Sequence, residues 1–105
     1  ILENDGAGIF TVAGTVAGQT GATALVAGDW DGDGALDLAV ANFGANQVAI
    51  LENDGAGIFT VAGTVAGQVN VSALAAGDWG GDGALDLAAA NKGADSVDVL
   101  KNRLP

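Results

Sequence analysis

Residues 28–38 read GDWDGDGALDL, and residues 77–87 read GDWGGDGALDL. The two stretches differ at one position, where Asp31 is replaced by Gly80. The first stretch has aspartates at the alternate positions 29, 31 and 33 and another at 37, and the second keeps three of these four, at 78, 82 and 86; glycines lie among them in both. This pattern favours a tight loop over a helix or a strand, because glycine relieves sharp turns of the backbone. Two nearly identical loops also indicate that the chain is built from repeats.

The chain repeats every 49 residues, as Ile1 and Ile50 show. Residues 1–19 and 50–68 are identical, and the two full copies differ at 11 of 49 positions. A period of about 40–50 residues is typical of propeller blades and of some solenoids. We therefore divide the chain into a first repeat, a second repeat and a remnant of a third, which are residues 1–49, 50–98 and 99–105.

Each repeat is expected to contain four short strands, which in the middle of the chain are residues 24–28, 37–42, 47–52 and 58–66. The second and third of these strands are apolar on both faces, so both of their faces should be covered. The fourth carries threonines on one face, which suits an outer strand in contact with water. A four-stranded sheet between two neighbours is a propeller blade. The predicted fold class is all-β: a β-propeller of four-stranded blades, two of them in this chain. A calcium-binding β-roll competes, but it repeats about every nine residues.

The loop after the first strand carries a carboxylate at its first, third, fifth and ninth positions. Calcium prefers about six to eight oxygen ligands in flexible geometry, and alternate side chains of a curled loop can point inward together. The start of the loop also matches an EF-hand, but position 12 would then be Val40 instead of glutamate, and no helix is expected on either side. The sequence thus predicts calcium bound by Asp29, Asp31, Asp33, the carbonyl of Ala35, and Asp37.

The second loop retains three of the four carboxylates and has Gly80 in place of the other. One ligand and one negative charge are lost, and water can fill the gap. The prediction is a weaker calcium site, formed by Asp78, Asp82, Ala84 and Asp86. The alternative for either loop, and more so for the second, is an Asp- and Gly-rich turn that binds no metal.

The composition excludes several classes of function. Thirteen acidic residues against three basic ones give a net charge of −10, whereas nucleic acids and anionic membranes require clustered basic residues. No cysteine is available for disulfides or thiolate metal sites. No signal-peptide pattern and no apolar run of about 20 residues is visible. Histidine, cysteine and tyrosine are all absent, so an activated nucleophile of the Ser–His or Cys–His type cannot be built, and the chain is not expected to be an enzyme.

The pattern DxDxDGxxDL between strands, followed by QVAILENDGAGIF, resembles the FG-GAP/VCBS repeat family. The resemblance covers both repeats. It implies calcium-bearing propeller blades like those of integrin-like heads, fungal lectins and bacterial surface proteins, commonly seven in a ring. By position it implies the same aspartate ligands in both loops, and Gly80 departs from the family pattern. Because calcium is about millimolar outside cells, an extracellular or cell-surface location is expected, unless the chain is engineered.

The order of strands predicts self-assembly. The chain begins with the end of a third strand and a fourth strand, residues 1–4 and 9–17, and it ends on a third strand, residues 96–102. The second blade therefore lacks its outer strand, while an outer strand without a blade lies at the N-terminus. Exchange of residues 9–17 between copies would complete the blade, and three or four copies would close a ring of six or eight blades. The predicted partner is the chain itself.

Two functions remain open. The first is a calcium-stabilised, self-assembling propeller scaffold, natural or engineered, without catalytic activity. The alternative is a lectin-like module of an extracellular protein that binds carbohydrate or protein. Trp30 and Trp79 are expected to pack between blades. Phe43, whose counterpart is Lys92, is expected to be exposed and is the candidate for contact with a sugar.

Overall fold

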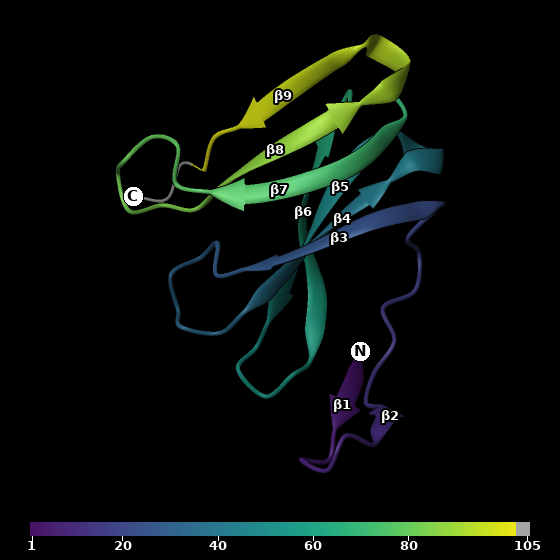
Figure 1. Ribbon diagram of the computed structural model, residues 1–105, viewed down its shortest axis with the longest axis vertical. Helices are drawn as coiled ribbons and strands as arrows, with labels where there is room; N and C mark the ends of the chain where they lie inside the picture. The colour runs from purple at the N-terminus through teal and green to yellow at the C-terminus, as the bar shows by residue number, and fades with distance from the viewer. Residues whose placement is uncertain (103–105) are drawn as a thin grey trace.

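The computed structural model describes residues 1–102, which form nine β-strands in three antiparallel sheets (Figure 1). Two short 3₁₀ turns, η1 (Phe43–Ala45) and η2 (Lys92–Ala94), join strands. Within these residues no helix is long and apolar enough to cross a membrane. The all-β prediction is confirmed. The strands are β1 (Leu2–Asn4), β2 (Phe10–Val12), β3 (Ala22–Gly28), β4 (Asp37–Asn42), β5 (Gln47–Asn53), β6 (Phe59–Ala66), β7 (Val71–Gly77), β8 (Asp86–Asn91) and β9 (Ser96–Leu100).

The four-stranded sheet has the order β3-β4-β5-β6, so strands that follow one another in the chain are neighbours in space. Its strands begin and end within two residues of the predicted limits. Both faces of β4 are covered, as expected from its apolar sequence: Ala39 and Ala41 are buried on one face and Val40 on the other. The outer strand β6 is mostly exposed, which agrees with its threonines.

The main core lies between the four-stranded sheet and the three-stranded sheet β7-β8-β9. The first sheet contributes Ala39, Ala41 and Val48, and the second contributes Leu87 and Ala89. These small side chains let the two backbones approach closely. Across the contact, the Thr23 hydroxyl donates a hydrogen bond to the carbonyl oxygen of Val71 over 3.1 Å.

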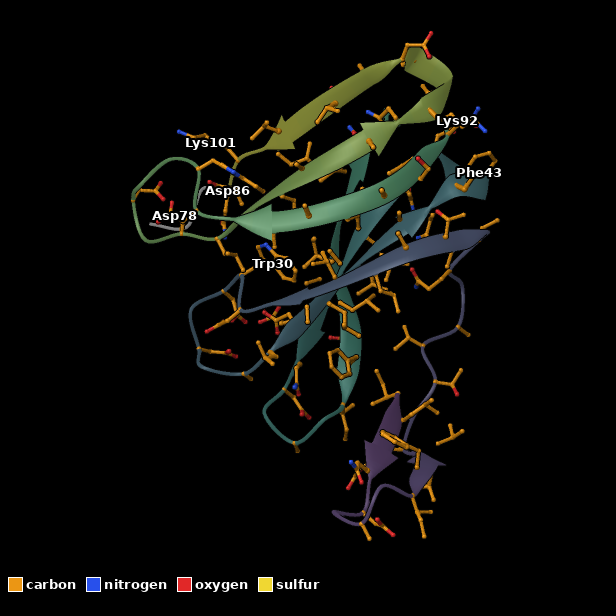
Figure 2. All side chains as sticks on the ribbon, in the orientation of Figure 1. Trp30, Phe43, Asp78, Asp86, Lys92 and Lys101 are labelled. Carbon is orange, nitrogen blue, oxygen red and sulfur yellow. The ribbon has the colours of Figure 1, made fainter. Side chains whose placement is uncertain are left out.

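The two tryptophans differ although they occupy the same place in the repeat. Trp30 packs in the core between the two sheets and is 7% exposed, as predicted (Figure 2). Trp79 is 54% exposed, so the prediction that it packs between blades is wrong for the single chain. The reason is topological: Trp30 is covered by the sheet that follows it, and no further sheet follows Trp79 within the described part of the chain.

Within residues 1–102, the sheet of the second repeat has three strands and no outer strand after β9, and a separate two-stranded hairpin, β1-β2, lies at the N-terminus (Figure 1). Residues 9–17 were expected to form one long strand, but only Phe10–Val12 does so. The same sequence forms the eight-residue strand β6, which pairs with the seven residues of β5. The strand β1 offers β2 only three partners. Residues 103–105 of the expected third repeat lie outside the described residues.

Candidate metal centre

The loop between β3 and β4 is curled around the carboxylate of Asp29. One oxygen of Asp29 accepts the backbone N–H of Gly32 over 2.9 Å, and the other accepts that of Gly34 over 2.8 Å. Both glycines have positive φ, +75° and +87°, a conformation that other residues adopt only with strain. The glycine spacing is therefore what allows the loop to close on its first aspartate.

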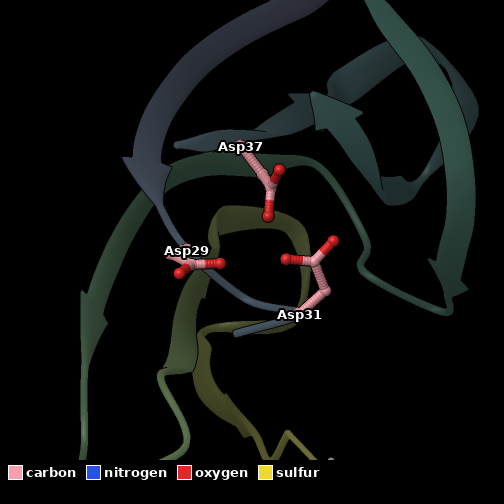
Figure 3. Close-up of side chains that lie close together, drawn as sticks. All are labelled: Asp29, Asp31 and Asp37. Atoms are coloured by element: carbon pink, nitrogen blue, oxygen red, sulfur yellow. The ribbon is translucent and has the colours of Figure 1, made fainter. Parts of the chain in front are cut away.

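The curled loop gathers carboxylates. Asp29, Asp31 and Asp37 each offer one oxygen, and these three atoms lie within 4.8 Å of one another (Figure 3). A second group, formed by Asp31, Asp33 and Glu52, meets the same limit. Asp31 belongs to both groups, so the five carboxylates form one continuous acidic cluster. Hard oxygen ligands of this kind are what Ca²⁺ prefers.

Asp37 is buried, with 1% of its surface exposed. Its carboxylate accepts the backbone N–H of Trp30 over 3.1 Å and that of Asn53 over 3.0 Å. It thus ties the start of the loop to the end of β5. Each carboxylate oxygen has two lone pairs, so these bonds leave acceptor capacity for a cation.

The pKa values of two carboxyls in the cluster are shifted in opposite directions. The Asp31 side chain shares a hydrogen bond with the Glu52 carboxyl, which together with partial burial raises the pKa of Asp31 from 3.8 to about 7. The backbone N–H of Gly34, with those of Gly32 and Asp33, lowers the pKa of Asp29. The carboxyls of Asp31 and Glu52 repel each other once both are ionised, and either a proton on Asp31 or a bound dication would relieve this repulsion.

Glu52 is not among the ligands predicted from the sequence, because it lies outside the loop, at the end of β5. The repeats contain a signal for it. Where Asp31 becomes Gly80, Glu52 becomes Lys101, so the two positions change together from acidic to non-acidic. Such a paired change is expected of side chains that meet in space, and Asp31 and Glu52 do meet.

The second loop curls in the same way but gathers fewer acids. Asp78 accepts the N–H of Gly83 over 2.8 Å, which is the main cause that lowers the pKa of Asp78. Asp86 is buried and accepts three backbone N–H groups, those of Trp79, Gly80 and Asn102. Among residues 1–102, no group of three acids within 4.8 Å forms in this loop.

Lys101 lies at the position that the missing carboxylate would take. A Cβ atom built on Gly80 would lie 3.3 Å from both Cε and Nζ of Lys101 and 3.6 Å from Cγ of Asp82. Figure 2 shows Lys101 beside the second loop, on the side of Asp86. The second loop thus lacks one acid and gains a nearby positive charge, both of which weaken attraction for a cation.

The remaining predicted ligands are two aspartates and two alanines, one of each in each loop. Asp33 is exposed and accepts the N–H of Ala35 over 2.9 Å, and Asp82 accepts that of Ala84 over 3.0 Å. Both alanines are half-buried. Which of these residues bind metal stays a prediction.

Short antiparallel strands in repeated sheets, with an acidic loop between the first two strands, define a β-repeat protein. Residues 29–89 match the FG-GAP-like repeat family, which is more than half of the chain. The chain therefore belongs to the FG-GAP-like repeat family. No curated protein matches it.

Proposed function

We propose that this protein is a calcium-stabilised scaffold that assembles with copies of itself into a β-propeller outside the cell and has no catalytic activity. The observation that carries the proposal is the pairing of two incomplete parts. Among the described residues, 1–102, the sheet β7-β8-β9 has no fourth strand, and the N-terminal hairpin contains a fourth-strand sequence that is not joined to a four-stranded sheet. Such complementary, heterologous contacts generate rings when the rotation closes.

The sequence repeat specifies how the fourth strand of one copy would pair with the edge strand β9 of another. Residues 1–19 are identical to residues 50–68, which include β6, and β6 pairs with β5 in a defined register. Since β9 corresponds to β5, the same register would place residues 9–17 of one copy along β9 of another. The short hairpin partner β1 would have to leave β2 first, and its three paired residues make it a weak competitor. Three copies give six sheets and four give eight.

Calcium is the metal that the first loop would hold. Asp29, Asp31 and Asp37 converge, and Asp33 and Glu52 adjoin them, so the donor set is all oxygen and strongly anionic. The carbonyl of Ala35 would add one neutral ligand. The second loop, with Asp78, Asp82, Ala84 and Asp86, would bind more weakly because of Gly80 and Lys101. A bound dication would neutralise the acidic cluster and fix the turn between the first two strands of each sheet.

Proline variants test the strand exchange. Gly14→Pro combined with Thr15→Pro removes two consecutive N–H groups, one of which must face the accepting strand. We expect this variant to stay monomeric by light scattering at concentrations where the unaltered chain assembles. The control, Gly14→Ala with Thr15→Ala, keeps both N–H groups and should assemble. Assembly of the proline variant at unchanged mass contradicts strand exchange.

A second candidate function is a lectin-like module that binds carbohydrate or protein. The observation in its favour is Phe43, which is 39% exposed in the turn η1, in agreement with the exposure predicted from its lysine counterpart. An exposed aromatic ring can stack on the apolar face of a sugar. A glycan array tests this candidate: binding that disappears in Phe43→Lys, which copies the residue of the second repeat, supports it, and silence of well-ordered protein contradicts it.

A further inference from the structure

One contact inside the chain already shows how one repeat packs on the next. The four-stranded sheet turns one face toward the three-stranded sheet, and we call this face A. The face of the three-stranded sheet that packs against face A is not the repeat counterpart of face A, and we call it face B. Face A is formed by Ala24, Val26, Ala39, Ala41, Val48 and Ile50, and face B by Leu74, Ala76, Leu87, Ala89 and Leu100, together with the half-buried Asp98 opposite Ala89.

Each sheet has both faces, so two faces remain outside this contact. The 49-residue repeat maps face A onto the outer face of the three-stranded sheet, which carries Ala73, Ala75, Ala88, Ala90, Val97 and Val99. It maps face B onto the outer face of the four-stranded sheet, which carries Leu25, Ala27, Leu38, Val40, Leu51 and, in place of Asp98, Ala49. Every one of these positions is apolar. The two sheets of the described residues therefore present a face A on one side and a face B on the other.

Residues at matching positions of the two repeats differ in exposure, as expected if each outer face is one side of a contact that the single chain does not form. Val48 of face A is fully buried, whereas its counterpart Val97 is 67% exposed. Leu74 of face B is half-buried, whereas its counterpart Leu25 is 64% exposed. Trp30 and Trp79 differ in the same direction. Apolar side chains that are exposed together in this way mark interaction surfaces.

The outer face B is also hollowed. A groove of about 470 Å³ runs over the four-stranded sheet, lined by Leu25, Leu38 and Leu51 and by Val16 and Ile1 of the N-terminal segment. Val16 packs on the small core of this face. The segment proposed to complete the sheet of a neighbouring copy therefore already lies on the side of the molecule where that copy would dock.

The polar groups that join the two sheets of one chain also have counterparts on the two outer faces. Inside the chain, the Thr23 hydroxyl lies 3.1 Å from the carbonyl oxygen of Val71 in the other sheet. The counterpart of Thr23 is Ser72, which keeps the hydroxyl and is exposed, and the counterpart of Val71 is Ala22. A hydrogen bond from Ser72 of one copy to the Ala22 carbonyl of the next would reproduce the contact.

A second polar contact follows the same rule. The Asn102 side-chain amide donates to the carbonyl oxygen of Trp30 in the neighbouring sheet over 2.7 Å. By repetition, the pair between two copies is the Asn53 amide and the Trp79 carbonyl. Both groups are retained in the sequence.

From these observations we infer that a second copy of the chain docks face to face, with face A of its three-stranded sheet against face B of the four-stranded sheet of the first. The contact is head-to-tail and repeats the packing found between the two sheets of one chain. It rests on the proposed self-assembly and specifies its main interface, separate from the exchanged strand. Docking would bury Val97, Val99 and Trp79 of one copy against Leu25 of the other.

Two charged variants test the direction of the contact. Val97→Glu spoils only face A, and Leu25→Glu spoils only face B; both side chains are exposed in the single chain, so folding should survive, as circular dichroism would verify. We expect each variant alone to scatter light as one chain. An equimolar mixture should give a particle of two chains, because one intact face A meets one intact face B. The control Ala56→Glu, in the exposed turn between β5 and β6, should assemble like the unaltered chain.

Any of three results overturns the inference: a single variant that retains the unaltered mass, a mixture that stays at one chain, or a control that fails to assemble while it remains folded. Acrylamide quenching gives an independent readout. In Trp30→Phe, the remaining Trp79 should become several-fold less accessible to quencher as concentration rises, whereas Trp30 in Trp79→Phe should change little. An assembled protein whose Trp79 stays accessible overturns face-to-face docking alone. An unaltered chain that is monomeric at every concentration overturns the proposed self-assembly as well.

Discussion

The buried carboxylate of Asp37 should stabilise the fold even without metal. It accepts two backbone N–H groups, from Trp30 over 3.1 Å and from Asn53 over 3.0 Å, and only 1% of its surface is exposed. In Asp37→Asn, an NH₂ group, which can only donate, replaces one carboxylate oxygen. One of the two N–H groups then faces another donor, and the other loses a charged acceptor.

The size of the effect follows from these two losses. A hydrogen bond to a charged group contributes about 1.5–3 kcal/mol, and an unsatisfied buried donor costs about 1–3 kcal/mol. Because the two losses overlap, we expect Asp37→Asn to lower the free energy of unfolding by about 2–4 kcal/mol. A small domain has a total stability of only about 5–15 kcal/mol, so the change is large.

Urea unfolding in excess chelator measures this effect without any contribution from calcium. The midpoint should fall while the dependence on urea stays constant. Asp33→Asn is the matched control, because Asp33 is exposed and accepts one local N–H, and we expect a change of less than about 1 kcal/mol. If Asp37→Asn also changes stability by less than about 1 kcal/mol in chelator, the reasoning from its hydrogen bonds is wrong.

The acidic cluster gives two further predictions. The pKa of Asp31 is raised to about 7, so the folded state binds a proton that the unfolded state releases near pH 4. In chelator, this contribution to stability is complete below about pH 4 and is lost as pH rises through about 7. The thermal unfolding temperature should therefore decline over this pH range, and Asp31→Asn should remove the decline. An unchanged decline in that variant contradicts the assignment of this pKa to Asp31. The second prediction concerns Gly80→Asp with Lys101→Glu, which copies the first loop onto the second. Calorimetric titration with calcium should then show two sites of similar affinity per chain, whereas Lys101→Glu alone should leave them unequal; one site, or two unequal sites, in the double variant refutes the role of these positions.

Much of the fold could be predicted from local sequence. The apolar alternation of residues 37–42 and 47–52, with glycine-rich turns between the runs, is enough to place β4 and β5 within one residue. The acidic loop was also found from spacing alone, because Asp29, Asp31 and Asp37 converge through the local curl of the loop.

The remaining features depend on neighbours distant in sequence. Glu52 reaches the loop only because β5 pairs beside β4, which the spacing within the loop cannot show. Residues 9–17 form a shorter strand than the identical β6 because β1 offers fewer partners. Trp79 is exposed for the same kind of reason, since burial of that position requires a following sheet.

Solution mass by light scattering, measured over a range of concentrations in millimolar calcium and again in excess chelator, tests the central claim most directly. One chain has a mass of 10.1 kDa. If calcium stabilises self-assembly, the particle in calcium should be a discrete one of three or four chains that loses mass in chelator. A mass of one chain at every concentration in both conditions contradicts the claim that this repeat protein assembles with itself.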